Sequence, residues 1–151
     1  MRADNSECRM LEENADRIFI SRSLGQFCSD SRGRPSLTNV DDKNIYHIGG
    51  HRDSDHFPFM ERWNIEAEKW TMWDRFPELN TGRSEHSTCH LGGYLYVVGG
   101  VSWARERLGS IEKLDLNQDL ENYKTRTEWQ LIKLATIPAR SFPVFCVLNS
   151  T

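Results

Sequence analysis

The chain has 151 residues, of which 38% are apolar and 27% charged, and its net charge is −3. A small negative charge without a basic cluster argues against a nucleic-acid-binding protein. A run of about eighteen apolar residues, which a membrane-spanning helix needs, is absent. The start, Met1 to Glu7, is polar and no hydrophobic region follows it, so no signal peptide is predicted.

The cysteines are widely spaced, at Cys8, Cys28, Cys89 and Cys146, and form no Cys-x-x-Cys pair. This spacing favours free thiols, with disulfides as the less favoured alternative. The predicted location is therefore cytoplasmic.

Residues 1 to about 13 are polar and charged, so they are predicted to be disordered. Alternating or apolar runs bounded by turn residues predict strands further on. The turns Asp41 to Asn44 and Leu91 to Gly93 separate two of the strand pairs. No segment has sustained helical periodicity, so the fold class is all-β. The predicted strands lie near 36–40, 44–48, 59–65, 69–73, 86–91, 93–98, 110–116, 128–132 and 141–148.

A repeat is the strongest signal in the sequence. The doublet Gly49-Gly50 returns 50 residues later as Gly99-Gly100, and each doublet closes a short apolar strand. A glutamate-containing strand and then a tryptophan follow each doublet. A shared period with matched flanks is typical of repeat architectures. The matched segments are Glu61 to Asn64 with Trp70, and Glu112 to Asp115 with Trp129.

This pattern resembles the kelch repeat, which forms one blade of a β-propeller. Met60 to Asn64 and Trp70 fit the repeat almost position for position. The second unit has Leu114 where an aromatic residue is usual, and residues 117–127 lengthen the turn before its tryptophan. That polar insertion is predicted to be mobile and dispensable. The structural motif residues are Gly49, Gly50, Trp63, Trp70, Gly99, Gly100 and Trp129.

The resemblance implies a partial kelch-type propeller of four-stranded antiparallel blades. At about 50 residues per unit the chain holds about two and a half blades, whereas propellers close with about four to eight. Alternation places Trp63 and Ile65 on one face of a sheet, so a blade must stack on another to bury it. Further blades or chains are therefore expected to close the ring. The predicted divisions are 1–34 (polar, with a degenerate outer strand at Asp16 to Ile20), 35–82 (repeat 1), 83–139 (repeat 2) and 140–151 (start of a third).

Catalytic chemistry is not predicted. His86 and His90 are four residues apart, but in a strand this spacing separates them by about 13 Å, too far to share one metal ion. No G-x-S-x-G motif is present. Neither a metal nor another cofactor is expected. The alternative is a fragment of a propeller enzyme resembling sugar epimerases or copper-radical oxidases, although no Tyr-Cys-His set matches the oxidases.

The resemblance implies a non-catalytic protein-interaction module, an adaptor or a substrate-recognition platform. Strand direction predicts that the loops 51–58 and 101–109 leave one face of the blades together with Arg34, Arg83 and Arg140. Arginine and aromatic residues on loops commonly form binding hot spots, and arginine binds carboxylates, so an acidic or phosphorylated peptide is the expected partner. Alternatively, these arginines pair with carboxylates of a neighbouring blade. The candidate partner-binding residues are Arg52, Asp53, His56, Arg83, Trp103, Arg105, Arg107 and Arg140.

Overall fold

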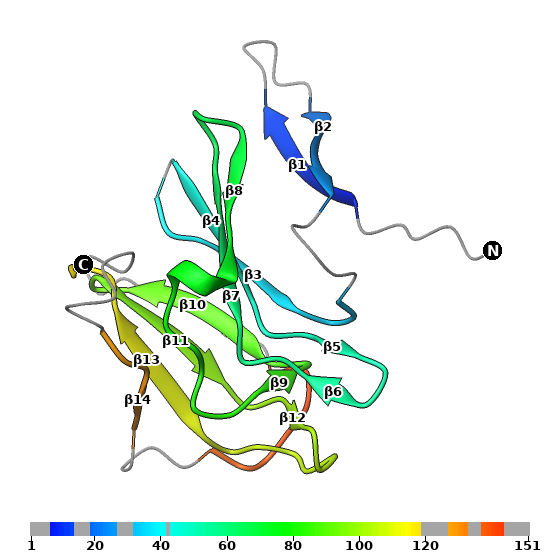
Figure 1. Ribbon diagram of the computed structural model, residues 1–151, viewed down its shortest axis with the longest axis vertical. Coiled ribbons are helices and arrows are strands. Elements are labelled where there is room, and N and C mark those ends of the chain that lie inside the picture. The colour runs from blue at the N-terminus through cyan, green and yellow to red at the C-terminus, as the bar shows by residue number, and fades with distance from the viewer. Residues whose placement is uncertain are drawn as a thin grey trace.

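The computed structural model describes residues 7–13, 19–26, 32–41, 43–118, 127–132 and 137–143, with only the backbone described for residues 7–26 (Figure 1). These residues form antiparallel β-sheets and one 3-10 turn, Trp73–Arg75. The all-β fold class is therefore confirmed. No helix in the described part of the chain is long and apolar enough to cross a membrane.

Two four-stranded sheets repeat the same strand order. The first sheet has the order β3-β4-β7-β8 and the second has the order β10-β11-β13-β14. Each sheet is the antiparallel meander expected of one blade. The first sheet consists of β3 (Ser36–Asn39), β4 (Asn44–Ile48), β7 (Met60–Asn64) and β8 (Lys69–Thr71), and the second of β10 (Ser87–Leu91), β11 (Tyr94–Val98), β13 (Ile111–Asp115) and β14 (Gln130–Leu131).

Three strand pairs complete the described strands. β5 (His51–Arg52) pairs with β6 (Asp55–His56), β9 (Arg83–Ser84) pairs with β12 (Val101–Ser102), and β1 (Glu7–Glu13) pairs with β2 (Phe19–Gln26).

The glycine doublets allow the chain to pass close to the backbone that begins the second repeat. Gly49 has φ +65°, and a Cβ there would lie 2.5 Å from the backbone oxygen of Arg83. Gly100 has φ +98°, and a Cβ there would lie 2.5 Å from the backbone oxygen of Ser84. Any larger residue would meet both a disfavoured backbone conformation and a clash, which explains why glycine occupies these positions.

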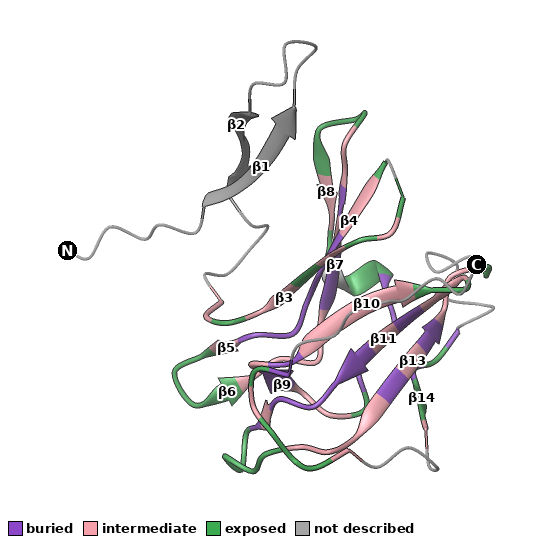
Figure 2. Cartoon of the chain, turned by 180° about the vertical axis from the view of Figure 1, so that it is seen from behind, coloured by how far each residue is buried: buried purple, intermediate pink, exposed green. Residues whose placement is uncertain are grey.

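The main core lies between the two sheets. The first sheet contributes Tyr46, Ile48 and Met60, which are at most 5% exposed. The second contributes side chains of β11 and β13, and Figure 2 shows buried residues along these two strands. The remaining members of this core are Phe76, Leu79, Leu95, Val97, Leu114 and Trp129. A smaller cluster on the opposite face of the first sheet joins Trp63 to Ile45, Ile65 and Trp70.

The two motif tryptophans share a register but differ in burial. In the first sheet, Trp70 pairs with Trp63. In the second sheet, Lys113 pairs with Gln130, which places Trp129 opposite Leu114. Leu114 is the equivalent of Trp63. Trp129 is 4% exposed and donates its indole N–H to the Pro77 carbonyl at 3.2 Å. Trp70 is only partly buried. The environments differ because Trp129 lies between two sheets of the chain, whereas Trp70 lies on the outer cluster.

Several predictions near the ends need correction. Disorder was wrong for residues 7–13, which form β1, because their backbone pairs with β2 in a hairpin. The strand predicted at 16–20 overlaps β2 only at Phe19 and Ile20, and residues 14–18 lie outside the described residues. Ser141 to Pro143 is not strand, and the rest of the predicted strand 141–148 is outside the described residues. So are residues 119–126 of the insertion.

Candidate partner-binding face

One end of the two sheets gathers the loops that follow the glycine doublets. β9 pairs with β12, and Gly33 bridges to His51, so the start of each repeat lies beside the loop after its own doublet. β5, β6, β9 and β12 lie together at this end in Figure 1. We call it the rim, comprising residues 51–57 and 101–109 together with Arg34, Glu85, Arg140 and Phe142.

The first rim hairpin is β5–β6. His51 pairs with His56 and Arg52 with Asp55, and the turn uses Asp53 at φ 54°. The Arg52 guanidinium lies over the Phe57 ring, 5.9 Å from its centroid. Arg52 and Asp53 are exposed at the tip of the hairpin, so both can be reached by a partner.

Two imidazoles lie side by side on this hairpin. The His51 and His56 rings are 5.6 Å apart and approach edge to face. Burial lowers the pKa of His51, and the nearby His56 and Arg34 lower it further. His51 is therefore neutral at neutral pH, and it contributes no positive charge to the rim there.

The second rim hairpin holds an exposed tryptophan. Val101 bridges to Arg107, the Ser102 N–H donates to the Glu106 carbonyl at 3.0 Å, and the Arg105 N–H donates to the Ser102 carbonyl at 2.9 Å. Trp103, inside this tight turn, is 73% exposed. Backbone hydrogen bonds thus hold a large apolar side chain in water beside two exposed arginines, Arg105 and Arg107.

Arg34, Arg83 and Arg140 were predicted to lie on one face, but Arg34 does not occupy the same repeat position as Arg83. Arg34, Glu85 and Phe142 share a positive φ, of 53°, 55° and 51°. The Glu85 N–H donates to the Arg34 carbonyl at 3.1 Å, and the Phe142 N–H donates to the Glu85 carbonyl at 2.7 Å. These three residues are therefore equivalent. The equivalent of Arg83 is Arg32, two residues before Arg34.

Arg83 is part of the interior and not of the rim surface. It is 0% exposed, its guanidinium forms an ion pair with Glu112, and it also donates to the Gly99 carbonyl at 3.0 Å. The backbone N–H of Asn80 donates to the same carboxylate at 2.7 Å. Arg83 therefore ties the loop before it to β13, and we remove it from the partner-binding candidates. Arg83 thus pairs with a carboxylate, as the alternative stated, but the carboxylate belongs to its own repeat and not to a neighbouring blade.

The sequence reading missed Arg32. Its guanidinium lies 2.6 Å from the Glu61 carboxylate, and the two side chains are 2% and 1% exposed. Arg32 precedes Glu61 by 29 residues, and Arg83 precedes Glu112 by the same distance. That equal spacing is the signal that identifies Arg32.

Arg34 and Arg140 remain on the rim. Arg34 is 58% exposed, pairs with Glu85, and lies over the Phe142 ring at 5.9 Å. Arg140 is exposed and donates its Nε–H to the Pro138 carbonyl at 3.2 Å. Phe142, 62% exposed, is a second large apolar residue here that sequence reasoning did not select.

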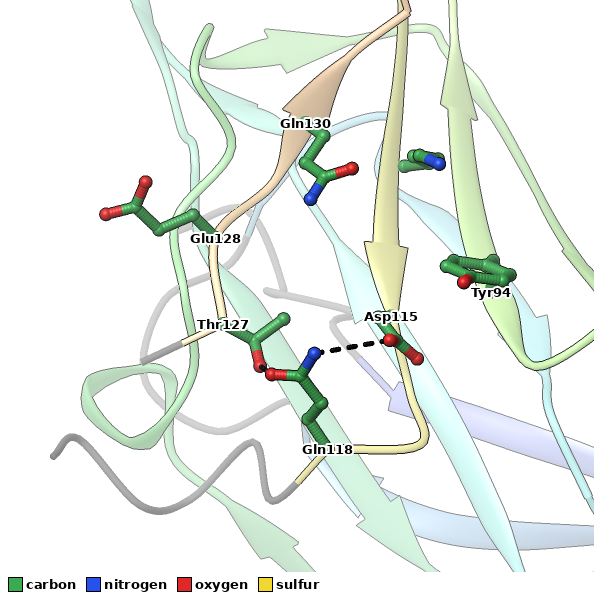
Figure 3. Close-up of a pocket in the computed structure, with 7 residues that line it drawn as sticks. Tyr94, Asp115, Gln118, Thr127, Glu128 and Gln130 are labelled. Carbon is green, nitrogen blue, oxygen red and sulfur yellow. Dashed lines mark hydrogen bonds between the residues drawn. The ribbon is translucent and has the colours of Figure 1, made fainter. Parts of the chain in front are cut away.

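Away from the rim, a polar hollow of about 330 Å³ lies against the second sheet. Figure 3 shows Thr127 donating to Gln118, and Gln118 donating to Asp115 at 3.3 Å. The other lining residues are Tyr94, Lys113, Glu128 and Gln130. A smaller hollow of about 250 Å³ adjoins Trp129.

The histidines weighed for metal binding lie in different environments. His86 is 6% exposed, and burial together with the nearby Arg83 lowers its pKa to about 3. His90 lies on β10 and is partly exposed. Among the described residues, no three His, Cys, Asp or Glu side chains come together in a way that could hold a metal ion.

Comparison with known proteins finds a motif match, a similar viral protein and a similar solved structure. Residues 82–120 match the model of the Kelch motif. Kelch repeat and BTB domain-containing protein 2 of cowpox virus (strain GRI-90 / Grishak) is 28% identical over 91 residues, which are 59% of this chain and 16% of the viral protein. The solved structure titled "Structure of YjhT" has a TM-score of 0.68 at 16% identity, covering 90% of this chain and 47% of that one.

These matches support a kelch-repeat protein, and the chain has the fold of part of a β-propeller. Its family supports a protein-interaction module in general terms. The chain spans less than half of the solved structure, and its match covers a still smaller share of the viral relative.

Proposed function

We propose that the chain is a non-catalytic adaptor or substrate-recognition platform whose partner binds the rim. The observation that carries this proposal is Trp103, 73% exposed on a turn held by backbone hydrogen bonds. An exposed tryptophan on a rigid hairpin loses little conformational freedom on binding, and tryptophan and arginine dominate binding hot spots. Phe142 supplies a second apolar contact on the same rim.

The charge of the rim suggests an acidic protein or peptide partner. The whole chain carries a net charge of −3, yet arginines outnumber carboxylates on the rim. Exposed guanidinium groups bind carboxylates or phosphates in a forked geometry. The arginines are Arg34, Arg52, Arg105, Arg107 and Arg140, and the carboxylates are Asp53, Asp55, Glu85 and Glu106.

The proposed location is the cytoplasm, where a thiol such as that of Cys89 stays reduced. Cys89 is not in a disulfide. Burial raises the pKa of this thiol, so it stays protonated and unreactive at neutral pH.

The experiment uses fluorescein-labelled peptides rich in Asp and Glu with one aromatic residue, each paired with its Asn and Gln analogue. Fluorescence anisotropy should show the wild-type chain binding the acidic member of a pair at least about tenfold more tightly. Trp103→Ala and Arg105→Ala should each weaken binding by about tenfold or more, without lowering the melting temperature.

Arg75→Ala is the matched control, because Arg75 is an exposed arginine on the 3-10 turn and not on the rim. Equal binding of the two members of every peptide pair would contradict the acidic partner. The rim would be the wrong site if Arg75→Ala weakened binding as much as Arg105→Ala. It would also be wrong if Arg105→Ala lowered stability while binding per folded molecule stayed unchanged.

A further inference from the structure

Two histidines of the rim lie directly opposite each other in the β5–β6 hairpin, which Figure 1 shows at the rim end of the first sheet. His51 pairs with His56, and their ring centroids are 5.6 Å apart. Both side chains are partly exposed. The hairpin therefore places two imidazoles close together on the surface to which the proposed partner binds.

Backbone hydrogen bonds fix the position of this pair. The Gly33 N–H donates to the His51 carbonyl at 2.7 Å, and the His51 N–H donates to the Gly33 carbonyl at 2.9 Å. A Cβ on Gly33 would lie 2.8 Å from the His51 ring, so the imidazole packs on the backbone at the start of the first repeat. On the second strand, His56 Nδ1 lies 3.3 Å from the Ser54 carbonyl oxygen. Both histidines therefore have defined positions on the rim.

Charged and titratable groups from neighbouring segments face His51. Burial lowers the pKa of His51 most, and the nearby His56 and Arg34 lower it further. Glu85 and Asp53 act in the opposite direction, but they do not cancel the decrease. A bound carboxylate would add another negative charge, and it would raise the pKa of His51 toward the ordinary value of histidine.

The second rim hairpin shows which residue type stands at the same position one repeat later. Val101 lies 50 residues after His51 and bridges to Arg107, as His51 pairs with His56. Arg107 is therefore the equivalent of His56. Arginine is always charged in proteins, whereas histidine changes charge between about pH 5 and 8. The first hairpin thus has a titratable group where the second has a permanent cation.

The charge of the rim depends strongly on this pair. The five arginines and four carboxylates of the rim give it a net charge of +1 when both imidazoles are neutral. Beside the histidines, the hairpin carries one positive and one negative side chain, Arg52 and Asp55. Protonation of both imidazoles raises the net charge of the rim to +3. Two protonated imidazoles this close repel each other, and an anion bound beside them offsets the repulsion.

We propose that His51 and His56 are specificity-determining residues through which the rim binds its acidic partner more tightly as the pH falls. Binding of the partner and uptake of protons are linked, so each favours the other by the same factor. The inference rests on the proposed function, because it assigns the control of partner binding to two residues of the same rim.

The test measures binding of the acidic peptides, and of their Asn and Gln analogues, at pH 7.5 and pH 5.5 and at constant ionic strength. A rhodamine label replaces fluorescein, because the fluorescence of fluorescein itself changes in this pH range. The peptide carboxylates stay ionised at pH 5.5, since the ordinary pKa values of Asp and Glu are about 4. The wild type should bind an acidic peptide about tenfold more tightly at pH 5.5, and the analogues should gain less than about twofold. Circular dichroism checks that the chain stays folded at both pH values.

Two variants test the charge of the pair. The double variant His51→Gln/His56→Gln removes both protonation sites, so its affinities at the two pH values should differ by less than about twofold. His56→Arg copies the second hairpin, and it should bind the acidic peptide about threefold or more tightly than the wild type at pH 7.5, with a smaller gain at pH 5.5. His90→Gln is the matched control, because His90 is a partly exposed histidine on β10 and not on the rim. It should keep the wild-type dependence on pH.

The inference is overturned if the wild type binds an acidic peptide equally tightly at both pH values. It is also overturned if the double variant keeps the full dependence on pH. In both cases the proposed function stands, because the acidic peptide still binds. If no acidic peptide binds at either pH, the proposed function is wrong, and this inference is wrong with it.

Discussion

His86 makes the stability of the chain depend on pH. It is 6% exposed, and it packs so closely against both glycine doublets that a Cβ on Gly49 would lie 2.5 Å from its ring and one on Gly100 would lie 2.9 Å from its own Cβ. Burial and the positive charge of Arg83 lower its pKa from 6.5 to about 3. In the folded state the imidazole therefore stays neutral at pH 5, whereas in the unfolded chain it takes up a proton.

The direction in which stability changes with pH follows from this difference between the folded and unfolded pKa values. A group that binds its proton more weakly in the folded state makes the protein less stable as the pH falls below its unfolded pKa. Each unit by which the pH falls between 6.5 and 3 lowers the free energy of unfolding by about 1.4 kcal/mol. Between pH 7.5 and pH 5, His86 alone should therefore lower the free energy of unfolding by about 2 kcal/mol.

The assay is urea unfolding of wild type and His86→Gln, followed by tryptophan fluorescence at pH 7.5 and pH 5. The stability difference between the two pH values should be about 2 kcal/mol smaller in His86→Gln. Val97→Ala, which leaves the imidazole in place, serves as the control and should destabilise the chain equally at both pH values. If His86→Gln keeps the full wild-type dependence on pH, the imidazole is not held neutral between the repeats.

Other perturbations test the packing. Arg83→Met should destabilise by about 3–5 kcal/mol, because it leaves the Glu112 carboxylate buried without a counter-charge. Adding Glu112→Leu should recover part of that loss in urea unfolding, and no recovery would mean that the pair is not coupled. Met60→Ala should cost about 2–5 kcal/mol, measured in the same way, and a cost below 1 kcal/mol would contradict a tight core between the sheets. Deleting residues 119–126 should leave the circular dichroism spectrum unchanged, since the entropic cost of closing a loop changes only slightly with loop length. Loss of the sheet signal would show that the insertion packs against the sheet.

Local rules account for what the sequence determined by itself. The strands and their turns follow from alternation of period two and from turn residues, both of which depend on neighbouring residues. The pairing of Trp63 with Trp70 across a short turn is determined in this way. The order of the strands within a blade follows from the resemblance to the kelch repeat.

Only the tertiary structure decided which side chains lie inside. Arg83 and Arg105 are both arginines near a loop, yet one is 0% exposed and the other is exposed. The difference is that β13 brings Glu112 to Arg83 from 29 residues away. Likewise Trp129 is buried and Trp70 is not, because burial depends on which face of a sheet meets another sheet. Contacts between segments distant in sequence set these outcomes, and no local pattern encodes them.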